Sequence, residues 1–354
     1  MKNLATILKA AALAVATLAM SSCVVNDNEP FNNEPQAIGF NAVVGPISDS
    51  RAVITDLNYP NTLPFAAFAS QLGDGKTWDT NKAEAVQLIG GDAVAYHTYL
   101  PGKWTTEAAY YWPDFGSLTF FAYSPYFDAQ GNKINNIAFT PTTGELKVTG
   151  WDVSAAKFKD VDLMMADVQK DLTSDLAPSG VPVAFRHKLA RVNFRAGLTS
   201  EYKEGSNTYK IFLRRVVLKN IYTKGNYSST ENSGRWTELS EPEQLVIYNN
   251  ATGVELSHLT SATIGTDLLV MPQGHLNAAS GAGLEIVYYD TKTGSTQTID
   301  IILRNKFPDS NWIINGSYTY MIMIDRGDPD YIEFNPPTVS GDWADAGTYT
   351  LTID

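Results

Sequence analysis

The sequence predicts an all-β protein, and three observations indicate this. The 354-residue chain contains 18 Tyr, 15 Phe and 7 Trp beside many Val, Ile and Thr, and these side chains suit a pleated, half-buried surface. Its 26 Gly and 17 Pro interrupt the chain at short intervals, as turns between strands do. After the first 22 residues, no segment sustains the periodicity of an amphipathic helix. Many short strands without helical crossovers favour sandwiches or barrels and make a parallel sheet improbable.

Residues 1–22 are expected to form a secretory signal. Lys2 and Lys9 supply a positive start, and the apolar stretch after them is too short to span a bilayer as a stable helix. Two serines then precede Cys23, the only cysteine. A pair of small residues before a cysteine resembles a bacterial lipoprotein box, in which the signal is cut before the cysteine and the thiol is acylated. Met20 stands where leucine is usual, and an ordinary signal peptide with an accidental cysteine is the alternative.

The charge of the mature chain excludes several functions. Residues 1–22 hold two of the 26 basic residues and none of the 38 acidic ones, so the remainder has a formal net charge of −14. Such a chain repels nucleic acid and anionic membrane surfaces, and its membrane attachment would be the lipid on Cys23. With that thiol acylated, none remains for a disulfide, a zinc–thiolate site or a nucleophile.

Residues 23–36 are polar and acidic, carry prolines and have no periodic apolar face, which predicts a flexible tether. The next segment, 37–44, alternates between apolar and other residues. Its apolar positions are Ile38, Phe40, Ala42 and Val44, which share one face of a half-buried strand. A polar loop around Arg51 follows.

Further strands are predicted at short intervals, separated by turn residues. In the first half they cover 63–70, 85–89, 94–100, 118–124, 137–139, 145–148 and 162–166. A break rich in turn formers at 174–182 predicts a boundary between an N-terminal domain, 37–180, and a C-terminal domain, 181–354.

The second half continues the pattern. Strands are predicted at 192–198, 211–221, 284–289, 296–303, 318–324 and 331–334, the third and fourth as a hairpin. The last residues alternate again, with Tyr349, Leu351 and Ile353 on one face.

No residue pattern indicates catalysis, a metal or a cofactor. The four histidines, His97, His187, His258 and His275, lack metal-ligand spacing and are interpreted as structural or surface residues. No GxSxG nucleophile elbow is present. The sequence GDGKT at 73–77 has serine at position 70, where a phosphate-binding loop requires glycine, so it predicts a turn.

Two patterns have a structural and a functional interpretation. Arg326, Gly327 and Asp328 form a tripeptide of the kind that receptors recognise, and the three aspartates of 325–330 could bind calcium, although Gly, Asp and Pro here also suit a hairpin turn. The aromatic cluster at 104–126 includes Trp104 and Trp112, whose rings could stack on sugars. Neighbouring aromatic strands more often form a core, and that interpretation is favoured.

Several segments, in this order, resemble the fimbrillin-like family of bacterial pilus subunits. They are the signal with its SSC sequence, SDSRAV at 48–53, YYWPDFGSLTFFAYSPY at 110–126, VDLMMADV at 161–168, VPVAFRHKLARVNF at 181–194, DLLVMPQ at 267–273, WIINGSYTYMIMI at 312–324 and the late Trp343. Together they span nearly the whole chain.

The resemblance implies two tandem β-sandwich domains of transthyretin-like topology and export as a lipoprotein. In stalk subunits of the family, an arginine-specific protease cuts the loop after the first strand, and a strand of the next subunit fills the opened groove. Carried over to this chain, the departing strand is 37–44 and the cut follows Arg51. The best donor is 348–354, with Tyr349, Leu351 and Ile353 entering the vacated pockets.

These expectations describe a structural subunit of a cell-surface fimbria at the outer membrane. It would have no enzyme activity, and it would polymerise head to tail with other fimbrial subunits. The alternative is a tip adhesin or a lipid-anchored glycan-binding protein that keeps residues 37–51 and binds a host receptor or glycan.

Overall fold

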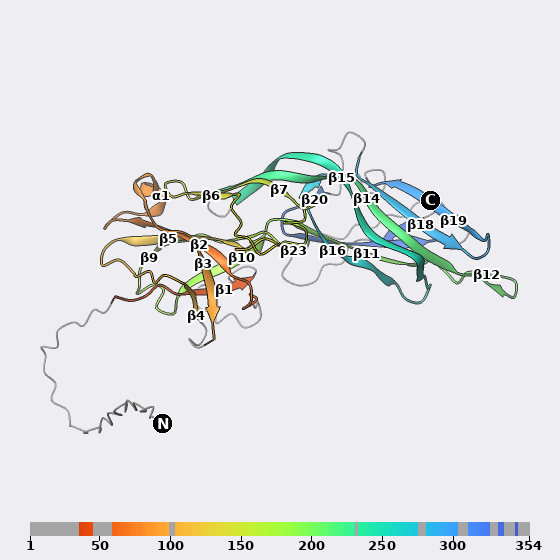
Figure 1. Cartoon of the computed structure of the whole chain (residues 1–354), viewed down its shortest axis with the longest axis horizontal. Helices are drawn as coiled ribbons and strands as arrows, with labels where there is room; N and C mark the ends of the chain where they lie inside the picture. The colour runs from red at the N-terminus through yellow and green to blue at the C-terminus, as the bar shows by residue number, and fades with distance from the viewer. Residues whose placement is uncertain are drawn as a thin grey trace, which may run out of the picture. The chain divides into compact units, whose positions relative to one another are not determined.

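The computed structural model describes residues 35–44, 59–98, 103–230, 233–274, 281–303, 311–325, 332–335 and 344–345. Nearly all regular structure among them is β (Figure 1). The described helices are a four-residue α1 (Trp78–Asn81) and a 3-10 turn, η1 (Lys82–Glu84). The predicted all-β fold is confirmed.

The first sheet has eight strands, and seven of them, all but β9, close on themselves. The eight strands are β1 (Phe40–Val44), β2 (Phe65–Leu72), β3 (Val86–His97), β4 (Lys103–Thr106), β5 (Ser117–Ser124), β8 (Met164–Ala166), β9 (Gln169–Leu172) and β10 (Val181–His187). Their order is β2-β3-β4-β1-β10-β8-β5-β9, and β2 also pairs with β5. The seven strands therefore form a closed circuit that encloses a core.

Two larger sheets and two short ribbons make up the rest. The six-stranded sheet contains β6 (Ile137–Thr140), β7 (Glu145–Asp152), β14 (Ile211–Thr230), β15 (Ser233–Glu255), β18 (Gly283–Asp290) and β19 (Ser295–Ile302). The five-stranded sheet contains β11 (Ala190–Leu198), β16 (Ala262–Val270), β21 (Gly316–Ile324), β22 (Ile332–Asn335) and β23 (Ala344–Asp345). The ribbons pair β12 (Lys203–Glu204) with β13 (Asn207–Thr208) and β17 (Gln273–Gly274) with β20 (Asn311–Trp312).

Three hydrophobic cores fill the spaces between these sheets. The first core lies within the closed circuit, around Phe40, Phe65 and Phe120. The second core lies between the six- and five-stranded sheets and includes Phe194, Leu213 and Ile286. The third core packs β2 and β5 against β7 and β14, with Phe121, Trp151 and Tyr227 among its members. Adjacent residues of β5 thus enter different cores, because successive side chains of a strand point to opposite faces.

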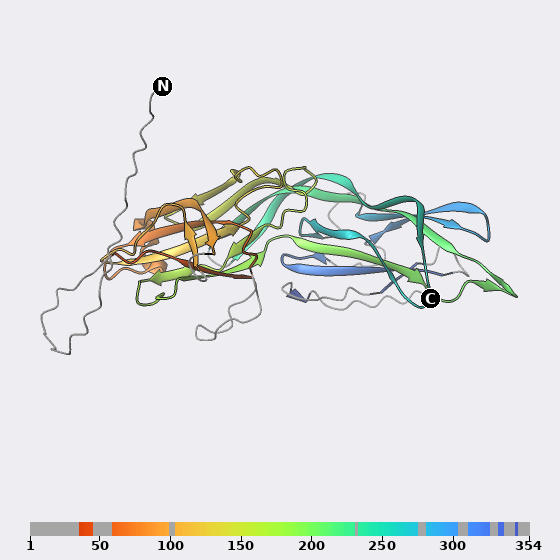
Figure 2. The same ribbon diagram turned by 60° about the horizontal axis from the view of Figure 1, so that its bottom comes forward.

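Strand β14 joins the two halves of the chain. Its residues 211–219 pair with β18, and its residues 224–230 pair with β7 of the N-terminal half (Figures 1 and 2). In addition, β10 follows the predicted boundary at 180 but pairs with β1 and β8. The described residues from Gln36 onward belong to one compact unit. The division into domains 37–180 and 181–354 stays a prediction.

The structure also corrects details of the predicted strands. Segments 85–89 and 94–100 belong largely to one strand, β3, and strands β15 and β16 were not predicted. No described sheet is wholly parallel, but three pairs of strands run parallel: β1 with β10, β11 with β21, and β21 with β23. Parallel neighbours require a long crossover, which here consists of other strands and loops in place of a helix.

Two glycines with the same backbone angle test how closely β15 approaches β16. Gly75 and Gly265 both have a φ of +71°. A Cβ at Gly265 would lie 2.3 Å from the Ile247 carbonyl oxygen, whereas one at Gly75 meets nothing within 4 Å. Gly75→Ala should lower the free energy of unfolding by about 1–2 kcal/mol, the cost of the left-handed backbone. Gly265→Ala should cost at least about 1 kcal/mol more, in urea titrations. Equal losses would contradict the close approach.

Candidate functional site

The first strand lies inside its sheet and not at an edge. Its residues pair in parallel with β10, from Phe40 opposite Val181 to Val44 opposite Phe185. On its other side, Phe40 pairs antiparallel with Trp104 of β4. Loss of this strand would therefore expose backbone groups on both neighbouring strands, and unpaired strand edges are unfavourable in water.

The side chains of β1 show the alternation that the sequence predicts. Ile38, Phe40 and Val44 are 3%, 2% and 6% exposed and belong to the first core, while Ala42 is half-buried against it. Asn41 faces outward, and its side-chain amide donates to the carbonyl of Ser179 at 2.9 Å. The strand thus contributes Phe40 and Val44 to the first core, and Ile38, just before it, adds a third buried apolar side chain.

Phe40 occupies the aromatic centre of the first core. Its ring meets Phe65 edge-on at a centroid distance of 5.9 Å and Phe120 at 6.0 Å. Edge-to-face pairs in this range add stability beyond the buried area alone. The largest pocket that removal of β1 would open is therefore the one that holds Phe40.

Main-chain bonds extend the attachment ahead of β1. The Ile38 amide donates to the Tyr110 carbonyl at 2.8 Å, and the Val181 amide donates to the Gly39 carbonyl at 2.8 Å. Gly180, with a φ of +110°, stands directly before β10, where a Cβ would lie 3.1 Å from the Gly39 carbonyl oxygen. Glycine is required there because the backbone approaches this closely in the left-handed region.

Tyr59, which follows Arg51 in the sequence, packs in the same core, and no sequence pattern pointed to it. Its ring stacks on Phe185 at 4.9 Å and meets Phe65 at 5.8 Å and Trp104 at 5.3 Å. Its hydroxyl lies 2.6 Å from Ser124 Oγ, and the side chain is 3% exposed. Burial raises the pKa of the Tyr59 hydroxyl, which keeps it neutral. Because it follows position 51, Tyr59 would stay with the body after a cut there.

Two cavities lie along β1. One of about 270 Å³ lies where the strand begins, between Ile38, Trp112 and Gly180. A second, of about 10 Å³, lies beside Phe40, and its wall includes Asp167 and Gln169. The packing around this strand therefore leaves room both at its start and beside its central aromatic ring.

Other predicted site residues lie outside the described residues. These are Cys23, Arg51, Tyr349, Leu351 and Ile353, together with His275 and the tripeptide Arg326, Gly327 and Asp328. Their roles stay predictions.

The aromatic cluster forms core packing. Trp104 and Trp112 are 4% and 8% exposed, and Phe120 and Phe121 are buried in different cores. The favoured interpretation is confirmed for these residues, and neither tryptophan offers an open face to a sugar. The most exposed rings of this segment are Phe115, at 62%, and Tyr111, at 50%.

The described residues offer no catalytic or metal-binding arrangement. His187 is buried with Nδ1 2.6 Å from Asp162 Oδ2, His97 is half-buried and His258 is exposed. In the described ranges, no group of three His, Cys, Asp or Glu side chains could hold a metal ion, and no helix is long and apolar enough to cross a membrane. The predicted turn at 73–77 is present at Asp74 and Gly75.

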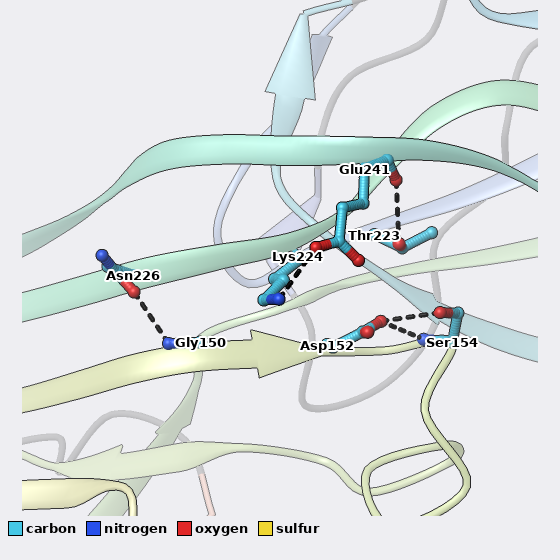
Figure 3. A network of polar contacts seen from close by, with 7 residues as sticks. All are labelled: Gly150, Asp152, Ser154, Thr223, Lys224, Asn226 and Glu241. Carbon is cyan, nitrogen blue, oxygen red and sulfur yellow. Dashed lines mark hydrogen bonds and ion pairs between the residues drawn. The ribbon is translucent and has the colours of Figure 1, made fainter.

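A set of polar contacts connects β7, in the N-terminal half of the chain, with β14 and β15 in the C-terminal half (Figure 3). The Asn226 side chain accepts from the Gly150 amide at 2.7 Å, which links β14 to β7. Lys224 Nζ lies 2.8 Å from Glu241 Oε1, and the Thr223 hydroxyl donates to the Glu241 carbonyl at 3.0 Å. These contacts join three strands, and the network is structural.

The contribution of Tyr59 to the stability of the first core can be measured separately from that of β1. Tyr59→Phe should lower the free energy of unfolding by about 1–2 kcal/mol, because Ser124 loses its buried hydrogen-bond partner. Tyr59→Ala should cost about 3–5 kcal/mol, because it leaves a cavity among three rings. The exposed Tyr111 is the matched control, and Tyr111→Phe should change stability by less than about 0.5 kcal/mol. Equal effects at the two positions would contradict the role given to Tyr59.

Comparisons with known proteins agree with this geometry. The fimbrillin-like family model matches residues 70–341. Among solved structures, a fimbrial protein from Bacteroides vulgatus is 18% identical and matches with a TM-score of 0.57, over 85% of this chain and 98% of its own. A protein described as a cell adhesion protein, from Bacteroides uniformis, is 18% identical with a TM-score of 0.49, over 85% of this chain and 97% of its own.

No curated protein matches the chain at a significant level. At 18% identity, the Bacteroides vulgatus structure supports the fold alone. The family model covers well over half of the sequence. The chain therefore belongs to the fimbrillin-like family, which consists of structural proteins and not enzymes.

Proposed function

We propose that this protein is a structural subunit of a cell-surface fimbria that assembles by donor-strand exchange. The proposal rests on one observation above all. A strand that is paired on both sides and buried in an aromatic core stands directly before the segment of the sequence that holds Arg51. Membership of the fimbrillin-like family supports a fimbrial or adhesion subunit, at the cell surface and in contact with other such subunits.

The free-energy balance explains why removal of the strand would drive assembly. Burial of each of Ile38, Phe40 and Val44 stabilises the fold by roughly 1.5–3 kcal/mol, and these contacts are lost when β1 leaves. The amides and carbonyls of β10 that face β1 would also lose their partners. A strand from another subunit with alternating apolar side chains restores both, as in other complexes formed by strand addition.

The proposed route starts with export. The signal at 1–22 directs the chain across the inner membrane, and lipid on Cys23 holds it at the outer membrane. An arginine-specific protease then cuts after Arg51 and releases the strand at 37–44. The donor is 348–354, with Tyr349, Leu351 and Ile353 facing the groove. A contact between two different surfaces of the subunit is head-to-tail, so it builds an open filament.

The test uses the chain purified without its lipid, through Cys23→Ser, and an arginine-specific protease. We expect one dominant cut after Arg51 by intact mass, followed by filaments under the electron microscope. Arg51→Lys is the matched control, because it keeps the charge but removes the residue that the protease recognises. A chain that lacks 348–354 should be cut but should not form filaments. Filaments from that truncated chain would contradict the donor assignment.

The alternative keeps β1 in place. A tip adhesin or a lipid-anchored glycan-binding protein would resist the protease, keep residues 37–51 and remain monomeric. Trp104 and Trp112 are buried, which argues against the stacking of their rings on sugars. A resistant monomer in the same experiment would favour this alternative.

A further inference from the structure

A polar groove lies on one face of β7, β14 and β15, in a different sheet from β1. Its volume of about 560 Å³ is within the range of sites that hold small ligands. Val148 and Tyr227 of these strands point from the opposite face into the third core. On the groove face, Lys147 pairs with Ser228, and Ser228 pairs with Arg235. Side chains at paired positions lie on the same face of a sheet, so the three strands place one cation on each side of a hydroxyl.

Uncharged donors hold the two carboxylates of this groove. The Ser228 hydroxyl donates to Glu145 Oε1 at 2.5 Å, and the Asn226 side-chain amide donates to Glu238 Oε2 at 2.5 Å. Both cations of the groove are exposed, and neither forms an ion pair with a carboxylate of the described residues. Lys219 of the same sheet, by contrast, pairs with two carboxylates. The two positive charges of the groove are therefore available to a ligand.

The other groups of the groove determine which kind of ligand fits. Glu145 and Glu238 are acceptors, whereas the hydroxyls of Ser233 and Thr237 can both donate and accept. A sugar ring presents hydroxyl groups around its rim and can satisfy donors and acceptors together. A peptide would need apolar contacts for its side chains, but large apolar side chains of these strands, such as Tyr227, point into the third core. The groove therefore suits a saccharide better than a peptide.

We propose that this groove binds an oligosaccharide that carries an acidic group, with a carboxylate or sulfate of the sugar between Lys147 and Arg235. A guanidinium group can bind two oxygens of such an anion at once, and an ammonium group adds a second positive charge. The hydroxyls of the sugar donate to Glu145 and Glu238. This inference gives the protein a ligand in addition to its proposed structural role. It does not depend on strand exchange, because β1 is not part of this sheet.

The acidic net charge of the chain does not prevent this contact. At physiological salt, exposed charges that are more than about 8 Å apart are largely screened from each other. The anion of the sugar therefore interacts chiefly with the charges that it touches, which are the two cations. The carboxylates of the groove are engaged by Ser228 and Asn226 and by the hydroxyls of the sugar.

The test uses the intact Cys23→Ser chain and isothermal titration calorimetry at physiological salt. The probes are trigalacturonic acid, which carries carboxylates, sulfated N-acetylglucosamine and the neutral sugar maltotriose. We expect an acidic probe to bind, and maltotriose to bind at least about tenfold more weakly, because it lacks the charge-assisted hydrogen bonds. Binding of the carboxylate probe, the sulfate probe or both supports the inference and identifies the preferred anion.

Substitutions in the groove locate the binding site. Lys147→Ala combined with Arg235→Ala should weaken binding of the acidic probe at least about tenfold, whereas Lys147→Arg keeps the charge and should keep the affinity. Lys159→Ala is the matched control, because it removes an exposed cation that lies outside the groove. All of these side chains are exposed, so the urea midpoint of each variant should equal that of the parent.

Three results would overturn the inference. They are binding of neither acidic probe, equally tight binding of maltotriose, and an equal loss of affinity in Lys159→Ala. None of these results bears on the cut after Arg51 or on filament formation. Conversely, a chain that resists the protease and stays monomeric would contradict the proposed function and leave this inference intact.

Discussion

The structure depends on the burial of β1 between β10 and β4. This strand supplies the central ring of the first core through Phe40 and satisfies main-chain groups on both neighbours. Because the circuit of strands closes only through β1, its loss opens the sheet as well as the core. Under the proposed function, loss of this strand requires that another take its place, and this requirement would link the fold to polymerisation.

The arrangement of the other strands would confine the proposed exchange to the first core. The side chains of β1 pack in the first core, whereas the second and third cores are built from other strands. Strand β14 joins the two halves, together with the polar contacts of Asn226 and Lys224. All of these residues are far in the sequence from residues 37–44. Tyr59, which follows Arg51 in the sequence, contacts rings of three strands around the first core.

The sequence predicted the features that depend on local pattern. The two-residue alternation located β1, and the aromatic content of 104–126 predicted a core, with Trp104 and Trp112 inside it. Partners distant in sequence could not be predicted, because alternation says nothing about which strand pairs with which. The parallel pairing of β1 with β10 is one example, and Tyr59, a lone ring before a proline with no periodic neighbours, is another. Strand β15 was missed because most of its side chains are exposed, so it lacks the apolar alternation.

The most direct test of the account is the composition of the assembled filament. Mass spectrometry of washed filaments, denatured before analysis, would show which residues of each subunit remain. Strand exchange predicts that the subunits in the filament begin at Ala52 and that no peptide containing residues 37–44 is present. Recovery of that peptide in equal amount with the subunits would contradict strand exchange, because it would show that β1 still occupies its own groove.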